Sequence, residues 1–357
     1  MPALLILGNE TVEGTIVHYD ANVQAGYEVT MEIFGENPND DVLFAIGMID
    51  TPTTFIVGAG ASKPYGLPTG ARMRIDAGNL TAESHLYRFI RLVLVRRDPT
   101  FKVDFINEFF QDLKDHTVES IDEYLEKRRV EPFATIGRVT IAALMGDALR
   151  SAKPRPAENE DWLLHIFRRM ARGIDAFPEF VEKNRCRFIT FNFDSFIEDR
   201  LLQLLTTTYG RNAVTSNPFS VIHVHGMLSL VPLETMEFEQ FLPGKNEKWV
   251  AWIERASQEI NVTADTISQD VLTQAGDAIE NSAVVCFLGF GFNRINLARL
   301  DLPNRLNKNV PRLFGSAIGL TRSSRDAIEN WLQGIELARE AKNCVQTLEE
   351  LPVIREI

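Results

Sequence analysis

Cysteine is scarce in this chain of 357 residues, which contains only Cys186, Cys286 and Cys344. The three lie far apart and form no C-x-x-C pair, and three thiols are too few for a four-cysteine zinc site. We therefore expect reduced, partly buried cysteines and no metal centre.

Long apolar runs are also missing. The longest, VLFAIGMI and AVVCFLGF, are much shorter than the roughly 18 residues that a membrane-spanning helix needs. The first ten residues, MPALLILGNE, have no basic region and too short an apolar segment for a secretory signal. We therefore expect a cytoplasmic protein without a membrane partner.

Positive charge is in deficit, with 37 Lys and Arg against 49 Asp and Glu and a net charge of −12. Tight binding to a nucleic acid backbone is driven by clustered basic residues, so direct binding of nucleic acid is not expected. An anionic ligand must instead be held locally, by backbone N–H groups.

The sequence does contain strands that alternate with helical patterns. Strand patterns occupy 53–57, 187–193, 220–226, 283–292 and 313–321, with helices expected near 196–205, 265–280 and 324–342. This alternation predicts an α/β fold, with a Rossmann-like parallel sheet covered by helices on both faces.

The predicted organisation has four parts. An N-terminal β extension (1–50) precedes a Rossmann-like domain (51–69 and 177–322), which is interrupted by a helical subdomain (70–176) and followed by a C-terminal helical segment (323–357). Within the subdomain, Ser120 and Glu123 form a capping-box pattern at the start of a helix. Residues 229–252 are interpreted as an acidic loop.

Glycines or polar residues end the expected strands, in GAGAS, FNFDS, HVHG and GFGFN. Ligands of parallel sheets bind at the carboxyl ends of the strands, so these four breaks indicate one site. In GAGAS, Gly58 and Gly60 can take positive φ and bring the backbone close to a pyrophosphate, or they form a plain strand-to-helix turn. The dehydrogenase fingerprint fails in two ways. Lys63 replaces its third glycine, and no acid ends a second strand at the required distance, because the chain enters the helical subdomain there.

The other strand ends supply side chains. Asn192 in FNFDS either faces a ligand or satisfies local turn amides, and Asp194 shares the N-cap of the next helix with Ser195. In HVHG, His225 is the better general base, and His223 is interpreted as a packed or hydrogen-bonded core residue. Two histidines without further ligands do not make a metal site.

In order, GAGAS…GLP, FNFD, HG and the glycine turn of GFGFN resemble the sirtuin pattern GAG-S…GIPDFR, TQNID, HG and GTS, over about residues 53–320. The chain looks most similar to the sirtuin-like branch of bacterial antiviral defence. It departs from protein deacylases in lacking the four-cysteine zinc module, and in reading GLPTGAR where they carry GIPDFR. Phe191 stands where the family has Gln, and Gly289-Phe290-Gly291 where it has GTS.

The resemblance implies hydrolysis of NAD to nicotinamide and ADP-ribose, as the toxic effector of an anti-phage system. It assigns Asn192 to orienting the ribose and water, His225 to accepting a proton, and Asp194 to the nicotinamide carboxamide. The residues expected to contact NAD are Gly58, Ala59, Gly60, Ser62, Phe191, Asp194, Gly289, Phe290, Gly291 and Asn293. Activity would be controlled by assembly into a homo-oligomer, or by a partner such as a hexameric ATPase or helicase.

Two other functions fit the same residues. The chain could sense NAD or ADP-ribose without cleaving it, or it could be a zinc-free deacylase. Release of nicotinamide from NAD, with and without an acyl-lysine peptide, separates the three.

Overall fold

A computed structural model describes residues 2–7, 10–15, 49, 51–152, 155–228, 247–262, 267–306, 311–339 and 342–351. The chain divides into two compact units, 1–45 and 46–357. In the first unit, β1 (Pro2–Leu7) pairs with β2 (Glu10–Thr15) as an antiparallel hairpin. Of the short strands expected in the N-terminal extension, the one at 12–19 overlaps β2, and those at 27–35 and 42–49 lie outside the described residues apart from Ile49.

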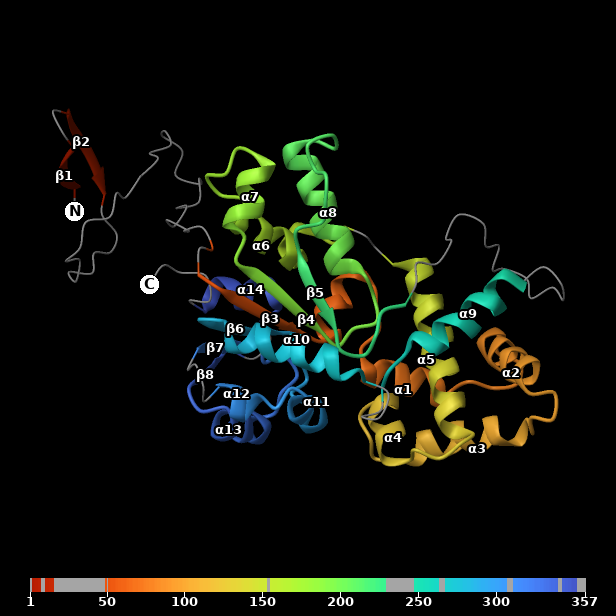
Figure 1. Ribbon diagram of the computed structural model, residues 1–357. Helices are drawn as coiled ribbons and strands as arrows, with labels where there is room; N and C mark the ends of the chain where they lie inside the picture. The colour runs from red at the N-terminus through yellow and green to blue at the C-terminus, as the bar shows by residue number, and fades with distance from the viewer. Residues whose placement is uncertain are drawn as a thin grey trace. The chain divides into compact units, whose positions relative to one another are not determined.

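The second unit contains one sheet of six parallel strands. These are β3 (Thr53–Val57), β4 (Cys186–Thr190), β5 (Ser220–His223), β6 (Val284–Leu288), β7 (Arg312–Gly315) and β8 (Ile335–Leu337). Their spatial order is β5-β4-β3-β6-β7-β8 (Figure 1). Counted within this sheet, that is the 3-2-1-4-5-6 order of the Rossmann fold, which confirms the predicted fold class.

Successive side chains of each strand serve opposite cores. Phe55 and Val57 of β3 face one core, and Ile56 faces the other. The first core is covered by α6 (Trp162–Met170), α7 (Phe177–Lys183), α8 (Phe196–Tyr209) and α14 (Cys344–Glu350). The second is covered by α10 (Gln269–Glu280), α11 (Arg294–Arg299), α12 (Leu302–Leu306) and α13 (Arg322–Trp331). Both faces of the sheet are therefore buried, as parallel sheets require.

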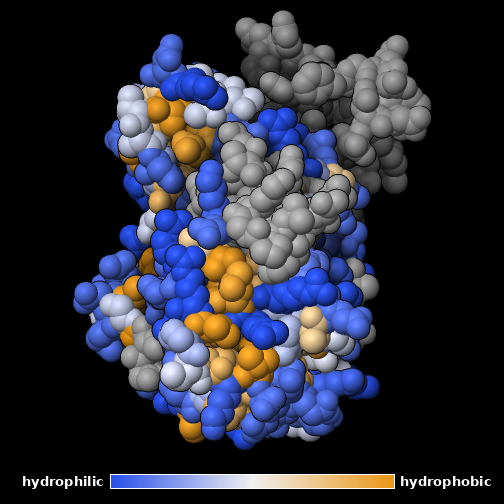
Figure 2. All heavy atoms as spheres, turned by 90° about the vertical axis from the view of Figure 1, so that its right-hand side faces the viewer, coloured by the Kyte–Doolittle hydropathy of each residue, from blue (hydrophilic) through white to orange (hydrophobic). Residues whose placement is uncertain are grey.

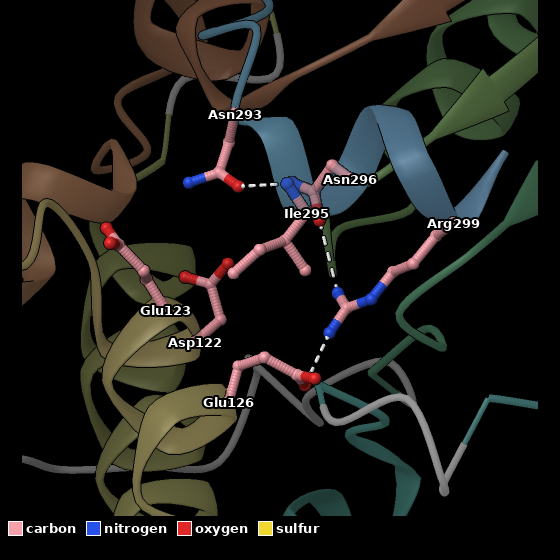
Figure 3. Close-up of a pocket in the computed structure, with 7 residues that line it drawn as sticks. All are labelled: Asp122, Glu123, Glu126, Asn293, Ile295, Asn296 and Arg299. Carbon is pink, nitrogen blue, oxygen red and sulfur yellow. Dashed lines mark hydrogen bonds and ion pairs between the residues drawn. The ribbon is translucent and has the colours of Figure 1, made fainter. Parts of the chain in front are cut away.

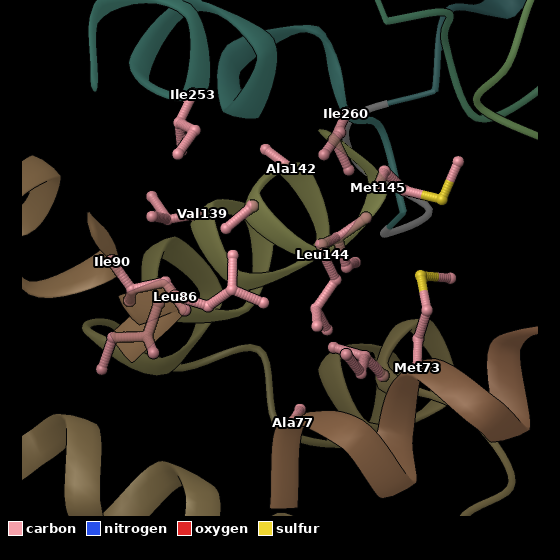
Figure 4. Packing of buried hydrophobic residues seen from close by; sticks show 14 of the residues in the cluster. Met73, Ala77, Leu86, Ile90, Val139, Ala142, Leu144, Met145, Ile253 and Ile260 are labelled. Atoms are coloured by element: carbon pink, nitrogen blue, oxygen red, sulfur yellow. The ribbon is translucent and has the colours of Figure 1, made fainter. Parts of the chain in front are cut away.

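A third core holds the helical subdomain together. Its helices are α1 (Gly70–Gly78), α2 (His85–Arg97), α3 (Asp104–Asp115), α4 (Ile121–Lys127), α5 (Phe133–Ser151) and α9 (Glu247–Glu259). Figure 4 shows how Ile90 of α2, Val139 and Ala142 of α5 and Ile253 of α9 interdigitate in this core. Ser120 caps α4 as predicted, since its side chain accepts from the Glu123 N–H at 3.3 Å.

Two boundaries differ from the sequence-based expectations. Helix α9 begins at residue 247, inside the segment 229–252 that was expected to be a loop. Its buried Trp249, Val250 and Ile253 pack on α5 and α2. Conversely, α6 packs on α8 and the sheet, although it falls in the stretch expected to be subdomain. In both cases the tertiary contacts of the helix, and not a local sequence pattern, determine the domain to which it belongs.

The prediction of one long C-terminal helix at 324–342 is also wrong. Helix α13 ends at Trp331, and Gly334 with φ of 83° turns the chain into β8, which pairs with β7. Only three residues form β8, too few for a clear alternating pattern.

The surface of the side that carries α2, α3 and α9 is mixed. Figure 2 shows hydrophobic side chains gathered at the middle of this face and bordered by hydrophilic ones. Among the helices that the structure describes, none is both long and apolar enough to cross a membrane.

Candidate functional site

The glycine loops that follow β3 and β6 touch each other where the strand order reverses. After β3 the chain forms a short 3-10 helix, η1 (Ala59–Tyr65), in place of a longer α-helix. The N–H groups of Gly58 and Gly60 donate to the carbonyls of Leu288 (3.0 Å) and Gly289 (2.9 Å). These two amides, expected to cradle a pyrophosphate, thus bind the neighbouring loop in this conformation.

Close approach explains the two glycines of GAGAS. A Cβ on Gly58 or Gly60 would lie 2.7 or 2.8 Å from the Gly289 oxygen. The positive φ that we expected is absent at both, and Gly58 has φ of −114°. Here glycine provides space rather than a left-handed backbone.

The loop after β6 is held in an unusual conformation. Gly289 has φ of 56°, and a Cβ there would lie 2.0 Å from the Ala61 nitrogen. Phe292 also has positive φ (51°), which is rare for a bulky residue and stores strain of the kind that gathers at functional sites. Gly291, by contrast, has open space around its Cβ position. A ligand can therefore approach the backbone at Gly291.

Phe191, Phe290 and Asn293 have structural partners. The rings of Phe191 and Phe290 are buried 5.3 Å apart in the core of the sheet. The Asn293 side chain accepts from the Ile295 N–H at 2.9 Å and caps α11. Phe191 and Phe290 thus shape the end of the sheet as packed residues.

Asn192 lies at the centre of a buried polar network beyond β4. Its Nδ2 donates to the Gly58 carbonyl (3.2 Å) and to Ser62 Oγ (2.9 Å), and Ser62 Oγ donates to Asp194 Oδ2 (2.9 Å). The Asn192 side-chain oxygen Oδ1 is buried and has no hydrogen-bond partner among the residues that the structure describes. The structure therefore brings Asn192, Ser62 and Asp194 together, and leaves one buried acceptor open among them.

Asp194 combines two roles. Its Oδ1 accepts from the Phe196 N–H at 3.2 Å and caps α8, as expected. Burial raises the pKa of its carboxyl group, and the hydrogen bonds from Ser62 and the Phe196 backbone oppose that rise. Ser195 does not share the cap: its Oγ donates to Asp199 at 2.7 Å, so the expected shared N-cap is wrong.

His223 is hydrogen-bonded on both ring nitrogens. Nε2 lies 2.7 Å from Glu198 Oε1 and Nδ1 lies 3.3 Å from the Asn192 carbonyl oxygen. Both partners are acceptors, so this geometry favours the imidazolium with two N–H donors. Burial lowers the pKa of His223, but the Glu198 hydrogen bond and charge outweigh it, and the net pKa is raised. The prediction of a hydrogen-bonded histidine is confirmed here.

His225 lies just after β5, among aromatic rings. Only 2% of it is exposed. Its ring packs edge-on against Phe191 (5.1 Å between centroids) and stacks with Phe193 (6.0 Å). The next residue is Gly226, which has φ of 81°. Only glycine fits there, because a Cβ would lie 2.1 Å from the Glu259 oxygen.

The Nε2 atom of His225 is covered by Arg299, whose Nη1 lies 2.8 Å away. A guanidinium can only donate, so Nε2 is the acceptor and the imidazole is neutral, with its proton on Nδ1. Burial lowers the pKa of His225 to about 4, and the positive charge of Arg299 adds to this while Asp122 opposes it. In this conformation His225 cannot accept a proton at Nε2.

A small pocket lies beside Arg299, between α4 and α11. Figure 3 shows Asp122, Glu123 and Glu126 of α4 facing Asn293, Ile295, Asn296 and Arg299. It has essentially no room for a water-sized molecule. Pockets for small molecules usually measure roughly 300–1,000 Å³, so a dinucleotide requires this region to open.

The loop carrying Ser62 is anchored by a second buried network. Asp161 accepts from Tyr65 Oη (3.1 Å) and from Arg200 Nη2 (2.6 Å), and the Trp162 indole N–H donates to the Ala61 carbonyl (2.9 Å). Hydrogen bonds from α6 and α8 thereby fix η1 in place.

Sequence reasoning missed Arg299 and Glu126, and it placed Glu198 only in a capping box with Ser195, which the structure does not form. Glu198 is one helical turn after Asp194, and that spacing could have indicated a side chain near the site. No sequence signal joins Arg299 to Glu126, because 173 residues separate them and only folding brings them together.

No protein-family profile matches this chain, and no curated protein is similar to it in sequence. Within the described ranges, no cluster of three or more His, Cys, Asp or Glu side chains could hold a metal ion. The chemistry of the site must therefore be argued from its own residues.

Proposed function

We propose that the chain hydrolyses NAD to nicotinamide and ADP-ribose. The observation that carries this proposal is the Oδ1 of Asn192, a residue only 5% exposed, which has no hydrogen-bond partner among the described residues and whose side chain reaches the Gly58 carbonyl at the end of β3. A buried polar atom without a partner costs about 1–3 kcal/mol, so its retention points to a bound donor. A ribose hydroxyl is a donor of the right kind.

The reaction breaks the bond between nicotinamide and ribose. The pyridinium leaves as neutral nicotinamide, so it needs no proton from a general acid, unlike the leaving group of a sugar hydrolase with paired carboxylates. Water adds to the sugar carbon and releases one proton, which a base must accept. Asn192 would hold the ribose hydroxyl and orient the water.

His225 is the proposed base, and Asp194 with Ser62 would line the nicotinamide end of the site. With Nε2 covered by Arg299, the conformation described here is a resting one. An enzyme that depletes a shared cofactor needs such a restrained state. A role as the effector of anti-phage defence, controlled by self-assembly or by a partner ATPase, rests on the sirtuin resemblance.

The decisive experiment incubates the purified chain with NAD and follows nicotinamide by chromatography, with and without an acyl-lysine peptide. Release without peptide is the expected result. Release only with peptide would identify a deacylase, and binding of NAD without release, also when the test is repeated with a partner protein, would identify a sensor.

Asn192→Ala and His225→Ala are expected to lower nicotinamide release by roughly 10²–10⁴-fold, which is the usual contribution of a positioned catalytic group. Asn217→Ala is the matched control, because Asn217 caps only the local turn before β5 through its bond to the Phe219 N–H. Unchanged turnover in both site variants would rule out these assignments.

A further inference from the structure

Arg299 connects the candidate base to the helical subdomain. Its Nη1 contacts His225 Nε2 at 2.8 Å and Asn296 Oδ1 at 3.1 Å, while its Nη2 contacts Glu126 Oε2 at 2.9 Å and the Val262 carbonyl at 2.7 Å. The side chain is only 7% exposed. One guanidinium therefore contacts α4, α11, the segment that follows α9 and the loop after β5.

This arrangement is costly in itself. Burial lowers the pKa of Arg299, opposed by the charge of Asp122, and its Nε is buried without a partner. Glu126 also pairs with Arg129, so it is shared between two cations. A buried cation with an unpaired N–H is more easily displaced than one whose donors are all satisfied.

We propose that Arg299 is a positioning residue that sets the state of His225. While Arg299 is bound to Glu126, it covers Nε2 and keeps His225 silent; when α4 shifts and Arg299 leaves, the lone pair of Nε2 becomes free. This inference rests on the proposed function, since it assigns the control of that same base.

The charges that face His225 come from two helices. Arg299 of α11 contacts the ring directly, and Asp122 of α4 acts on it at longer range. Glu126 of α4 acts through Arg299, with Arg129 beyond it. Because burial remains after Arg299 is removed, the proton affinity of His225 is expected to recover only in part.

The test replaces Arg299 by Met, which keeps the volume and removes both the charge and the donors. In the wild-type chain, ¹⁵N-resolved NMR of the imidazole should show the Nδ1–H tautomer with no titration above about pH 5. In Arg299→Met the pKa of His225 should rise by about one to three units, the usual effect of removing a nearby like charge. Nicotinamide release at pH 7.5 should rise roughly 10-fold or more, toward the full contribution of a positioned base.

Arg299→Gln is the second variant, in case the first does not fold. It removes the charge but retains N–H donors for Val262 and His225, so the pKa should rise while turnover increases less. Arg305→Met is the matched control, because Arg305 also pairs with a glutamate (Glu280, 2.8 Å) and also has a buried, unpartnered Nε. It should leave both the His225 signals and turnover unchanged.

Each outcome decides the inference. An unmoved His225 pKa in both Arg299 variants overturns it, and so does a shifted pKa accompanied by lower turnover. If the pKa shifts but neither the variants nor the wild-type chain release nicotinamide, the hydrolase proposal fails while the control of His225 by Arg299 stands.

Discussion

At the scale of single residues, the buried side chain of Asn192 lowers stability by keeping one hydrogen-bond acceptor open. The side chain of Asn192 donates two hydrogen bonds, but its oxygen accepts none from the described residues. A net hydrogen bond contributes about 1 kcal/mol, whereas an unmet buried acceptor costs about 1–3 kcal/mol. The two effects nearly cancel, so selection for stability alone does not explain this asparagine.

Asn192→Ala is therefore expected to change the free energy of unfolding by no more than about 1 kcal/mol. Ser62→Ala should be more destabilising, by about 1–3 kcal/mol, because it removes the donor to the buried Asp194 carboxylate. Urea unfolding of the two variants measures the difference. A large loss in Asn192→Ala alone would show that the carboxamide serves the fold.

One buried histidine, His225, and one half-buried histidine, His165, should make the fold sensitive to acid. Burial lowers the pKa of both His225 and His165 to about 4, from 6.5. Between these values the unfolded chain binds protons that the folded chain does not, so stability falls as the pH falls from about 6.5 to 4. His223 works in the opposite direction, because its raised pKa gives stability that is lost as the pH rises through that pKa.

His165→Gln should remove part of this acid sensitivity. Its Nε2 is buried without a partner, and Arg169 and Arg168 add to the effect of burial on its pKa. The variant should recover about 1–2 kcal/mol at pH 4.5 relative to pH 7.5, at about 1.4 kcal/mol per pKa unit. Urea titrations at both pH values test this, with the exposed His85→Gln as control. An identical pH dependence in wild type and His165→Gln would contradict it.

At the scale of elements, the site depends on two loops that pack backbone against backbone. The carbonyl of Gly289 occupies the space that side chains at positions 58 and 60 would need. This packing brings the ends of β3 and β6 close enough to share hydrogen bonds. The same packing uses amides that a dinucleotide-binding loop would present to its ligand.

Gly289→Ala is expected to destabilise the chain by roughly 2–4 kcal/mol, because it combines a left-handed backbone with a clash against Ala61. Gly291→Ala should cost less than about 1 kcal/mol, since its Cβ position is open and its φ is not positive. Thermal unfolding compares their stability, and isothermal titration with ADP-ribose compares their affinity. Weakened binding in a stable Gly291→Ala variant would place the ligand at this loop; intact binding would place it elsewhere.

The elements that could be predicted from sequence are those with a strong local pattern. β3 is a run of β-branched and aromatic residues and β6 is a continuous apolar run, and a glycine follows each. Both strand ends and their meeting at one edge follow from the sequence. Helix α9 could not be assigned with the same ease, because its fit to α5 arises only in three dimensions. β8 was missed because three residues carry no usable alternation.

The candidate site was predictable in part for the same reason. Asn192, Asp194 and Ser62 were expected from strand ends and do lie together. The contact of Arg299 with His225 and Glu126 depends on the docking of a whole subdomain. A local pattern does not encode such a contact.

At the scale of the whole molecule, the net charge of −12 opposes an anionic ligand. This field reaches far at low salt, since the Debye length is about 30 Å at 0.01 M and about 10 Å at 0.1 M. The residues proposed to hold the ligand are a buried carboxamide, a hydroxyl and peptide groups, whose short-range contacts salt screens little. Repulsion at long range should then dominate the salt dependence.

ADP-ribose is accordingly expected to bind more tightly as salt rises from 10 to 150 mM, with Kd falling by a factor of about 2–5. Uncharged nicotinamide serves as the control, and its Kd should stay constant. Isothermal titration at four salt concentrations measures both. The opposite trend, with binding weakened by salt, would show that exposed Lys or Arg side chains hold the pyrophosphate, and would move the anionic half of the ligand away from the glycine loops.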